Sequence, residues 1–331
     1  SPLLFLPPTV EIPRTDRFQP SDQPLITLAG HSNSPIYGLA IDSTQRFAFT
    51  GADDHLIKVW DIATGCLLYL LSLSLTPSQT IRGHRGKITD LVINANNSVL
   101  MSASEDGWIF FWDITPITVA AQPAFPRFRC VGCCCLHKGF VCQLKYDAVN
   151  DLLFSAGDDG LVCTWNVALV DPMKPHARQN LGEEELLVFA LQHGGSFRFG
   201  GNSGTSPANS VLFCDLSPDG RFIATGAKDG TVRIWRIPFI VRNDMQVTRR
   251  VRRPLPPSRL VDSHESASLL LQTLSAHSKG VDTVLFSHSG DQLITASEAE
   301  GNACVWSCSA NFAVCTPIVL HCDISADFGS G

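Results

Sequence analysis

The stretch FTGADDHLIKVWDI, residues 49–62, decides the fold, because four later segments of the chain repeat its pattern. These segments are MSASEDGWIFFWDI (101–114), FSAGDDGLVCTWNV (154–167), ATGAKDGTVRIWRI (224–237) and ITASEAEGNACVWSC (294–308). Each of the five places a tryptophan near its end: Trp60, Trp112, Trp165, Trp235 and Trp306. Self-similarity of this kind indicates a fold built from units that stack on one another.

A second pattern precedes each tryptophan segment and predicts a further strand. It consists of an apolar residue, two others, an apolar residue, one other and an apolar residue, as in Ile36/Leu39/Ile41. A turn and a second apolar strand follow, so each repeat is expected to form a small antiparallel sheet. A single sheet cannot bury both of its faces, and radial stacking of several sheets into a propeller solves this problem.

These motifs resemble the WD40 family over roughly residues 25–306. Gly30-His31 opens the first repeat and Trp60-Asp61 ends it, and Gly83-His84 and Trp112-Asp113 do the same for the second. The resemblance implies an all-β WD40 β-propeller with at least five recognisable four-stranded blades. Since seven or eight blades are usual in that family, we expect an incomplete or truncated propeller.

In WD40 blades a His, a Ser or Thr, an Asp and the Trp form a buried hydrogen-bond network, and the resemblance implies the same here. From the first repeat to the fifth, the residues are His31, Thr50, Asp54, Trp60; His84, Ser102, Asp106, Trp112; His137, Ser155, Asp159, Trp165; Thr225, Asp229, Trp235; and His277, Thr295, Trp306. The fourth repeat has no His at the expected distance and the fifth has Glu300 in place of Asp, so only three networks are expected to be complete. Side chains that repeat in register with a Trp indicate architecture and not a catalytic triad.

The composition points away from several classes of function. The 331 residues include 25 basic and 31 acidic side chains, a net charge of −6, so nothing global favours direct binding to nucleic acid. The longest apolar runs, such as Leu67–Leu71, are too short to span a membrane. The sequence has no phosphate loop, no metal motif on a helix and no nucleophile elbow. We therefore expect a non-catalytic protein without cofactor, metal or small-molecule substrate.

The stretch RCVGCCCLHKGFVC, residues 129–142, contains five of the twelve cysteines and raises the alternative of a zinc site. Structural zinc needs four convergent ligands, commonly two Cys-x-x-Cys pairs, and only one such pair is present. His137 lies 28 residues before Trp165, as His84 lies 28 before Trp112, so the blade network is expected to use it. We favour free thiols, in a segment that connects two blades, over metal or redox chemistry.

The start of the chain agrees with free thiols. SPLLFLPPTV lacks a basic segment and is interrupted by prolines, so we interpret it as the start of a fragment and not as a secretory signal. Without such a signal, the cysteines are expected to stay reduced.

The first two repeats also resemble the bromodomain-and-WD-repeat (pleckstrin-homology-domain-interacting protein) family. The similar segments are residues 28–68 and 81–114, and Asp90-Leu91 and Asn96-Asn97 are the most specific matches. This resemblance implies a scaffold for protein–protein interactions in a chromatin-linked regulator of transcription. It implies a nuclear location, with a cytoplasmic one left open. The alternative is a substrate-recruiting adaptor of a cullin-4 ubiquitin ligase, although its usual Arg is replaced here by Ala63 and Thr115.

The spacing of the repeats suggests where domains begin and end. We expect an N-terminal extension over 1–23, the propeller over 24–308 and an irregular tail over 309–331. Long insertions are expected at about 115–135, 168–208 and 238–272, because the tryptophans are further apart than the ~40–45 residues of a plain repeat. Residues 24–31, PLITLAGH, are expected to form the outer strand of a blade whose other strands lie elsewhere. The run Arg249–Arg253 is interpreted as a solvated loop, with a nuclear localisation signal as the alternative.

Acidic residues at equivalent turns are the candidate binding positions. Asp53, Glu105 and Asp158 each precede the network Asp, where loops on a rigid scaffold are well placed to bind partners. Three carboxylates on neighbouring blades would attract a basic peptide, such as a histone tail. Lys228 and Ala299 break the pattern, and the alternative is that these acids are ordinary turn residues.

Overall fold

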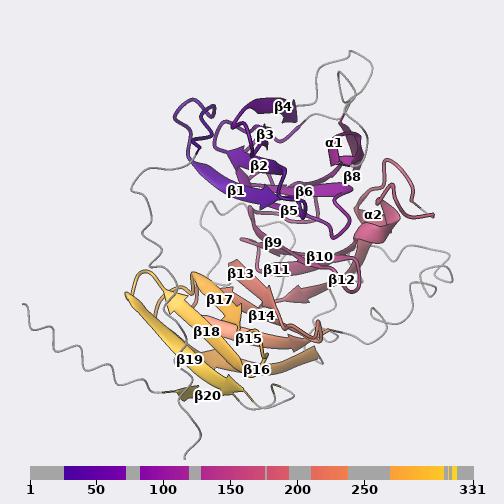
Figure 1. Ribbon diagram of the computed structural model, residues 1–331. Helices are drawn as coiled ribbons and strands as arrows, with labels where there is room; N and C mark the ends of the chain where they lie inside the picture. Colours follow the sequence, from indigo (N-terminus) through magenta and orange to yellow (C-terminus); the bar gives the residue numbers. More distant parts are fainter. Residues whose placement is uncertain are drawn as a thin grey trace, which may run out of the picture.

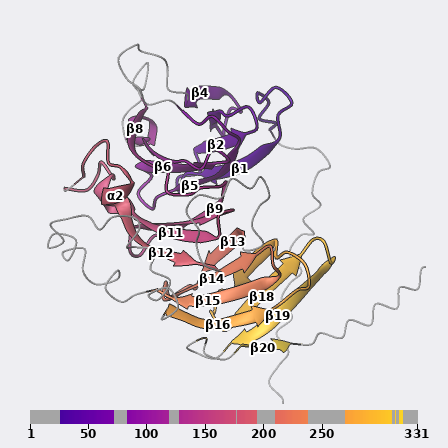
Figure 2. The ribbon, with the colours of Figure 1, turned by 180° about the vertical axis from the view of Figure 1, so that it is seen from behind.

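The computed structural model describes residues 26–71, 83–118, 128–175, 177–193, 210–237, 269–308, 312 and 315–318. In these residues the chain forms five four-stranded antiparallel sheets, each built from four strands that are consecutive in the sequence. The sheets follow one another around an arc, from the indigo first sheet to the yellow fifth one (Figure 1), and the reverse view shows the same succession (Figure 2). The prediction of a propeller with at least five four-stranded blades is confirmed.

The strands of each blade run in order from the inner edge to the outer edge of the sheet. Blades 1 and 2 comprise β1 (Ile36–Ile41), β2 (Phe47–Ala52), β3 (Ile57–Asp61), β4 (Leu67–Leu71), β5 (Ile88–Ile93), β6 (Val99–Ser104), β7 (Ile109–Asp113) and β8 (Arg129–Cys134). Blades 3 and 4 comprise β9 (Val141–Asp147), β10 (Leu152–Gly157), β11 (Leu161–Asn166), β12 (Leu187–Gln192), β13 (Val211–Leu216), β14 (Phe222–Ala227), β15 (Thr231–Arg236) and β16 (Leu270–Ser275). Blade 5 comprises β17 (Thr283–Phe286), β18 (Gln292–Ser297), β19 (Asn302–Cys308) and β20 (Cys315–Ile318). The inner strands β1, β5, β9, β13 and β17 pack against one another in that order.

Apolar side chains fill the space between successive blades. Phe49 on β2 belongs to the same buried cluster as Ile88 and Leu91 on β5 of the next blade. The equivalent pairings recur at each junction. The buried apolar residues on β5, β9 and β13, and on or just before β17, are at most 2% exposed: Ile88, Leu91, Val141, Leu144, Val211, Cys214, Val281 and Val284. Burial of this extent stabilises the fold by roughly 1.5–3 kcal/mol for each large side chain.

A polar contact accompanies three of these junctions. The Oδ2 atom of Asp90 on β5 accepts a hydrogen bond from the N–H of Leu144 on β9 at 2.9 Å. In the same way, Gln143 accepts from Cys214 at 2.8 Å and Asp215 accepts from Phe286 at 2.8 Å. Each contact satisfies a backbone donor that no strand of its own blade reaches, so it fixes how neighbouring blades are aligned.

The two ends of the arc expose the positions that are buried at every internal junction. On β1, Ile36, Leu39 and Ile41 are 48%, 59% and 52% exposed, whereas the equivalent Leu91 is 2% exposed. A shallow depression lies beside this face, lined by Ile41, Asp42, Ser43, Gln45 and Ile62. At the other end, Ile294 on β18 is 38% exposed, although its counterpart Phe49 in blade 1 is fully buried. The described blades therefore leave one apolar sheet face uncovered at each end.

The outer strands correct four of the expected boundaries. The expected insertion over 115–135 contains α1 (Thr115–Thr118) and strand β8. The one over 168–208 contains α2 (Glu183–Leu186) and β12, and the one over 238–272 ends inside β16. The tail over 309–331 is not wholly irregular, because β20 closes blade 5. An outer strand pairs on one side only and lies partly in solvent, so its sequence carries a weak apolar signal.

Residues 26–30 pair with no described strand, and the fourth strand of blade 1 is β4. The expectation that residues 24–31 complete a blade whose other strands lie elsewhere stays a prediction. Residues 24 and 25 lie outside the described residues, as do the Arg249–Arg253 run and the extension over 1–23.

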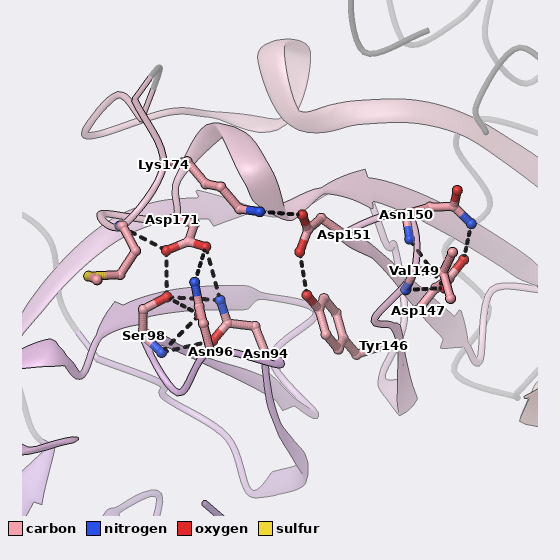
Figure 3. A network of polar contacts seen from close by, with 11 residues as sticks. Asn94, Asn96, Ser98, Tyr146, Asp147, Val149, Asn150, Asp151, Asp171 and Lys174 are labelled. Carbon is pink, nitrogen blue, oxygen red and sulfur yellow. Dashed lines mark hydrogen bonds and ion pairs between the residues drawn. The ribbon is translucent and has the colours of Figure 1, made fainter. Parts of the chain in front are cut away.

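Polar contacts hold the segment after β11 against blades 2 and 3 (Figure 3). The buried carboxylate of Asp171 accepts hydrogen bonds from Asn96 Nδ2 at 2.8 Å and from the Ser98 hydroxyl, both in the turn between β5 and β6. Lys174 pairs with Asp151 at 2.9 Å in blade 3. Further along, Leu181 O accepts from the N–H of Cys133, so this segment also covers the outer edge of β8. The segment after β11, which the spacing predicts to be an insertion loop, thus connects blades 2 and 3.

We expect Leu91→Ala to destabilise the protein far more than Leu39→Ala, although the two positions are equivalent in the repeat. Removal of a fully buried leucine side chain costs roughly 2–5 kcal/mol, whereas the exposed Leu39 has little contact to lose. Urea unfolding curves of both variants measure the difference. Equal losses would show that the face of β1 is covered in solution.

We expect Asp90→Asn to stabilise the protein above about pH 6 by roughly 1–2 kcal/mol. Burial raises the pKa of Asp90 from 3.8 to about 6, despite the backbone hydrogen bonds that it accepts. Charging this carboxyl therefore costs more in the folded state than in the unfolded one. The cost is absent below about pH 4, grows as the pH rises towards 6 and is constant above that.

Gln143 shows that an uncharged amide can replace the carboxylate, because it accepts the equivalent hydrogen bond at the next junction. The free energy of unfolding is measured for the parent protein and for Asp90→Asn between pH 4 and pH 8. The two values should differ only as the pH rises. A difference independent of pH would contradict the assignment.

Candidate protein-interaction site

Each of the first three blades contains the hydrogen-bond network that the sequence predicts. In blade 1, His31 Nδ1 lies 2.8 Å from Asp54 Oδ2 and His31 Nε2 lies 2.7 Å from Thr50 Oγ1. The Trp60 ring N–H donates to the same hydroxyl at 2.7 Å. The network joins the segment before the inner strand, which carries His31, to the second and third strands. It therefore fixes the loops at this end of the blade.

Blades 2 and 3 repeat the same contacts at similar distances. His84 contacts Ser102 at 2.7 Å and Asp106 at 3.3 Å, and Trp112 donates to Ser102 at 2.9 Å. The corresponding distances in blade 3 are 2.8 Å from His137 to Ser155, 3.0 Å from His137 to Asp159 and 2.9 Å from Trp165 to Ser155.

The turn that carries the network acid is tight. Gly107, Gly160 and Gly230 follow Asp106, Asp159 and Asp229 with φ between +81° and +83°, a conformation that favours glycine. The chain therefore turns at once into the third strand.

The acid of the network carries a stable negative charge. Burial opposes the charge on Asp106, but hydrogen bonds from His84 and from the N–H groups of Arg85 and Trp108 outweigh it and lower the pKa to about 2. The carboxylate therefore stays ionised at neutral pH and holds the loop that contains Arg85 in place.

The fourth blade does contain a histidine, which the spacing did not reveal. His193 directly follows β12 and lies 42 residues before Trp235, because the long connection falls after the histidine and not before it. Its Nδ1 atom lies 2.9 Å from Thr225 Oγ1, which also accepts from Trp235 at 2.9 Å. A search that counted from the end of the outer strand would have found it, since His137 likewise follows β8.

The ring of His193 is reversed relative to the other blades, and a threonine relays its second contact. Thr231 donates its hydroxyl to Asp229 at 2.6 Å, so its oxygen accepts from His193 Nε2–H at 3.0 Å. Nδ1 is then the acceptor for Thr225. Burial, together with the charge of Arg233, lowers the pKa of His193 to about 3, so this ring is neutral at physiological pH.

The fifth network is complete, contrary to expectation. His277 Nδ1 lies 2.9 Å from Glu300 Oε2, and Nε2 lies 3.1 Å from Thr295, which accepts from Trp306 at 3.1 Å. The longer side chain of Glu300 compensates for the extra residue in this turn. All five blades therefore connect a tryptophan, a hydroxyl and a histidine.

The cysteines of residues 129–142 lie mostly in an outer strand and not in a connecting segment. Cys130, Cys133 and Cys134 belong to β8, and Cys135 directly follows it. Burial raises the pKa of Cys130 to about 12, and burial with the nearby Glu183 raises that of Cys135 to about 11. These thiols are therefore protonated and poorly reactive. Within the described parts of the chain, no group of three or more His, Cys, Asp or Glu side chains could hold a metal ion.

The candidate binding acids occupy equivalent places in successive blades, at the turn between the second and third strands. Each follows the second strand of its blade, and its N–H donates to the carbonyl just before the inner strand: Asp53 to Pro35, Glu105 to Lys87, Asp158 to Phe140 and Lys228 to Ser210. In blade 5 the residue that directly follows the second strand, β18, is the exposed Glu298. Ala299 is the extra residue of this turn and does not occupy the equivalent position. Four of the five equivalent positions thus carry a carboxylate.

A lysine lies between two of these acids. Lys87 Nζ is 3.6 Å from both Asp53 and Glu105, and it lies 5.9 Å from the centre of the Tyr37 ring. Glu105 and then Asp53 raise the pKa of Lys87. Between blades 3 and 4, the hydroxyl of Ser210 donates to Asp158. The acidic row is therefore partly neutralised by the chain itself.

A protein-family model decides the classification. The WD domain, G-beta repeat model matches residues 22–61, 75–113, 128–166, 200–236 and 268–307, together more than half of the chain. The chain belongs to the WD40 repeat family. Propellers of this family are typically scaffolds for protein–protein interactions, and the loops described above are where such a scaffold presents variable side chains.

Relatives of this WD40 protein share only parts of its length. A bromodomain and WD repeat-containing protein of Dictyostelium discoideum is 41% identical over 85 residues, 26% of this chain and 3% of that protein. Mouse striatin is 28% identical over 158 residues, 47% of this chain and 20% of striatin. The chain therefore spans a small part of these relatives.

A solved structure shares the fold. A chain in the crystal structure of the mitotic checkpoint complex superimposes with a TM-score of 0.56 at 16% identity, over 88% of this chain and 65% of that chain. At this identity the likeness shows the architecture alone. No helix in the described part of the chain is long and apolar enough to cross a membrane.

We expect His193→Ala to cost roughly 2–3 kcal/mol of folding free energy, and Asp229→Asn less than about 0.5 kcal/mol. Loss of the ring leaves the buried Thr225 hydroxyl without one of its partners, whereas the hydrogen bonds of Asp229 among the described residues come from Thr231, at the surface. Thermal and urea unfolding of both variants measure this order. The reverse order would show that Asp229 and not His193 supports blade 4.

Proposed function

We propose that the loop row of Asp53, Glu105, Asp158 and Glu298 binds a peptide segment rich in Lys and Arg. The observation that carries this proposal is the repetition of a carboxylate at one structural position in four of five blades, each held by the same backbone contact or strand register. Such a row presents negative charge along neighbouring blades, which attracts a basic ligand and orients it.

We further propose that this scaffold acts in a nuclear, chromatin-linked regulator of transcription, with histone tails as one class of basic ligand. Support comes from the local resemblance to a bromodomain and WD repeat-containing protein over 85 residues. Where a cullin-4 adaptor would carry its Arg, the hydroxyl of Thr115 donates to Asp113 at 2.6 Å, so the structure adds nothing in favour of that alternative.

Lys87 is expected to compete with the ligand. It occupies the space between Asp53 and Glu105 that a ligand ammonium or guanidinium group would take. Its side chain is 38% exposed, so it can move aside at small cost. The paired acids are therefore available only to a ligand that displaces this lysine.

We expect the double change Asp53→Ala/Glu105→Ala to weaken binding of a fluorescent Lys/Arg-rich peptide by about 5–30-fold, because exposed charge pairs contribute roughly 0.5–1 kcal/mol each. Fluorescence anisotropy at low and high salt measures the affinity. Glu184→Ala is the matched control, since Glu184 is an exposed acid on α2, away from the row. Equal losses in the control and the double variant would contradict a specific site.

Lys87→Ala is expected to act in the opposite direction and tighten binding of the same peptide by about threefold. Removal of the lysine frees both carboxylates for the ligand. Salt should weaken binding more steeply in this variant than in the parent protein, because more ligand charge is paired. Weaker binding would show that Lys87 contacts the ligand directly.

A further inference from the structure

Two cysteines face one another at the outer edge of blade 5. Cys308 ends β19 and Cys315 begins β20, and the two are paired in the antiparallel ladder. Their sulfur atoms lie 2.8 Å apart, and the side chains are 8% and 6% exposed. Among the described cysteines, no other two sulfurs make such a contact.

The ladder geometry favours a covalent bond at this pair. Pro317 stands opposite Trp306, and because proline has no N–H, that pair cannot exchange two backbone hydrogen bonds. Bonded and non-bonded pairs alternate along an antiparallel ladder, so Cys308 and Cys315, two residues further on, also form a non-hydrogen-bonded pair. The Cα atoms of such pairs lie about 4.5 Å apart, within the range that a disulfide spans.

Contacts from blade 4 hold Cys315 in this place. Gln272 on β16 accepts a hydrogen bond from the N–H of Cys315 at 2.9 Å. Between the two cysteines, Phe312 packs against Phe222 at 4.8 Å and Phe286 at 5.2 Å between ring centres. These contacts of Cys315 and Phe312 with blades 4 and 5 therefore bring the two thiols together.

We propose that Cys308 and Cys315 form an oxidative modification site, which hydrogen peroxide converts to an intrablade disulfide. The Cys315 thiolate attacks one peroxide oxygen, the O–O bond breaks, and the departing hydroxide takes a proton to form water. Cys308 then attacks the resulting sulfenic sulfur, the S–O bond breaks, and the hydroxyl leaves with the Cys308 proton as a second water. Two thiols lose two electrons and two protons, and one peroxide becomes two waters.

The roles of the two sulfurs follow from their surroundings. The contact with the Cys308 sulfur lowers the pKa of Cys315, although burial opposes this, so Cys315 is the more nucleophilic of the two. The same contact raises the pKa of Cys308. The partner thiol is already at the distance needed to resolve the sulfenic acid before a second peroxide oxidises it further.

The disulfide would hold β20, the outer strand of blade 5, against β19. In the sheet β20 has only β19 as a neighbour, so it is an edge strand that can open independently. A bond that links residues 308 and 315 restricts this opening by roughly ten- to hundredfold. Oxidation therefore stabilises the end blade without changing its fold.

Peptide mapping of the folded protein tests the proposal. The protein is treated with a small excess of hydrogen peroxide, alkylated and cut with chymotrypsin, which cleaves after Phe312 and separates the two cysteines. We expect the two peptides to remain joined, to separate on reduction, and to stay separate in Cys308→Ser and Cys315→Ser. Cys66→Ser is the matched control, because Cys66 is exposed and remote in the sequence, and it should not affect the link.

Hydrogen exchange provides the second measurement. The backbone N–H groups of Cys315, Thr316 and Ile318 should exchange about tenfold more slowly after oxidation and recover on reduction, while those of β8 stay unchanged. Three results of the peroxide treatment would each overturn the proposal. These are oxidation of Cys315 to a sulfinic acid, a disulfide from Cys308 or Cys315 to a different cysteine, and two thiols that remain free. Either variant that fails to fold leaves the mapping of the parent protein as the deciding result.

Discussion

One hydrogen bond recurs in all five blades, and the rest of each blade depends on it. The indole N–H of the repeat tryptophan donates to a Ser or Thr hydroxyl on the neighbouring strand, at 2.7–3.1 Å. A buried indole needs an acceptor, and the hydroxyl that provides it needs an acceptor for its own proton. A histidine nitrogen meets that need, and the other ring nitrogen then requires a further partner.

The blades differ in the last partner of this series of hydrogen bonds, which is the group that contacts the second nitrogen of the histidine. Blades 1 to 3 use an aspartate that contacts the histidine directly, blade 5 uses Glu300, and blade 4 inserts Thr231 between His193 and Asp229. Each solution satisfies the same donors with different residues, so a strict residue pattern finds three networks where five exist. The constraint is that every buried polar group has a partner, and the sequence has several ways to meet it.

This explains which parts of the fold could be predicted from the sequence. The tryptophans, the apolar inner strands and the Asp-Gly turns repeat at short range, so the number and type of the described blades were predictable. The outer strands β8, β12, β16 and β20 were assigned to insertions or to a tail, because an edge strand follows a connection of variable length and buries only part of its surface. His193 was missed for the same reason, since its distance from Trp235 includes such a connection.

Exposure at a repeat position depends on the neighbouring blade, which the sequence of one repeat does not encode. Leu39 and Leu91 occupy the same position, yet one is 59% and the other 2% exposed, because only the second has a blade in front of it. The binding loops show the opposite relation. Their backbone contacts repeat from blade to blade while their side chains change from Asp53 to Lys228, so the network fixes where the loops are, and the loops remain free to determine what they bind.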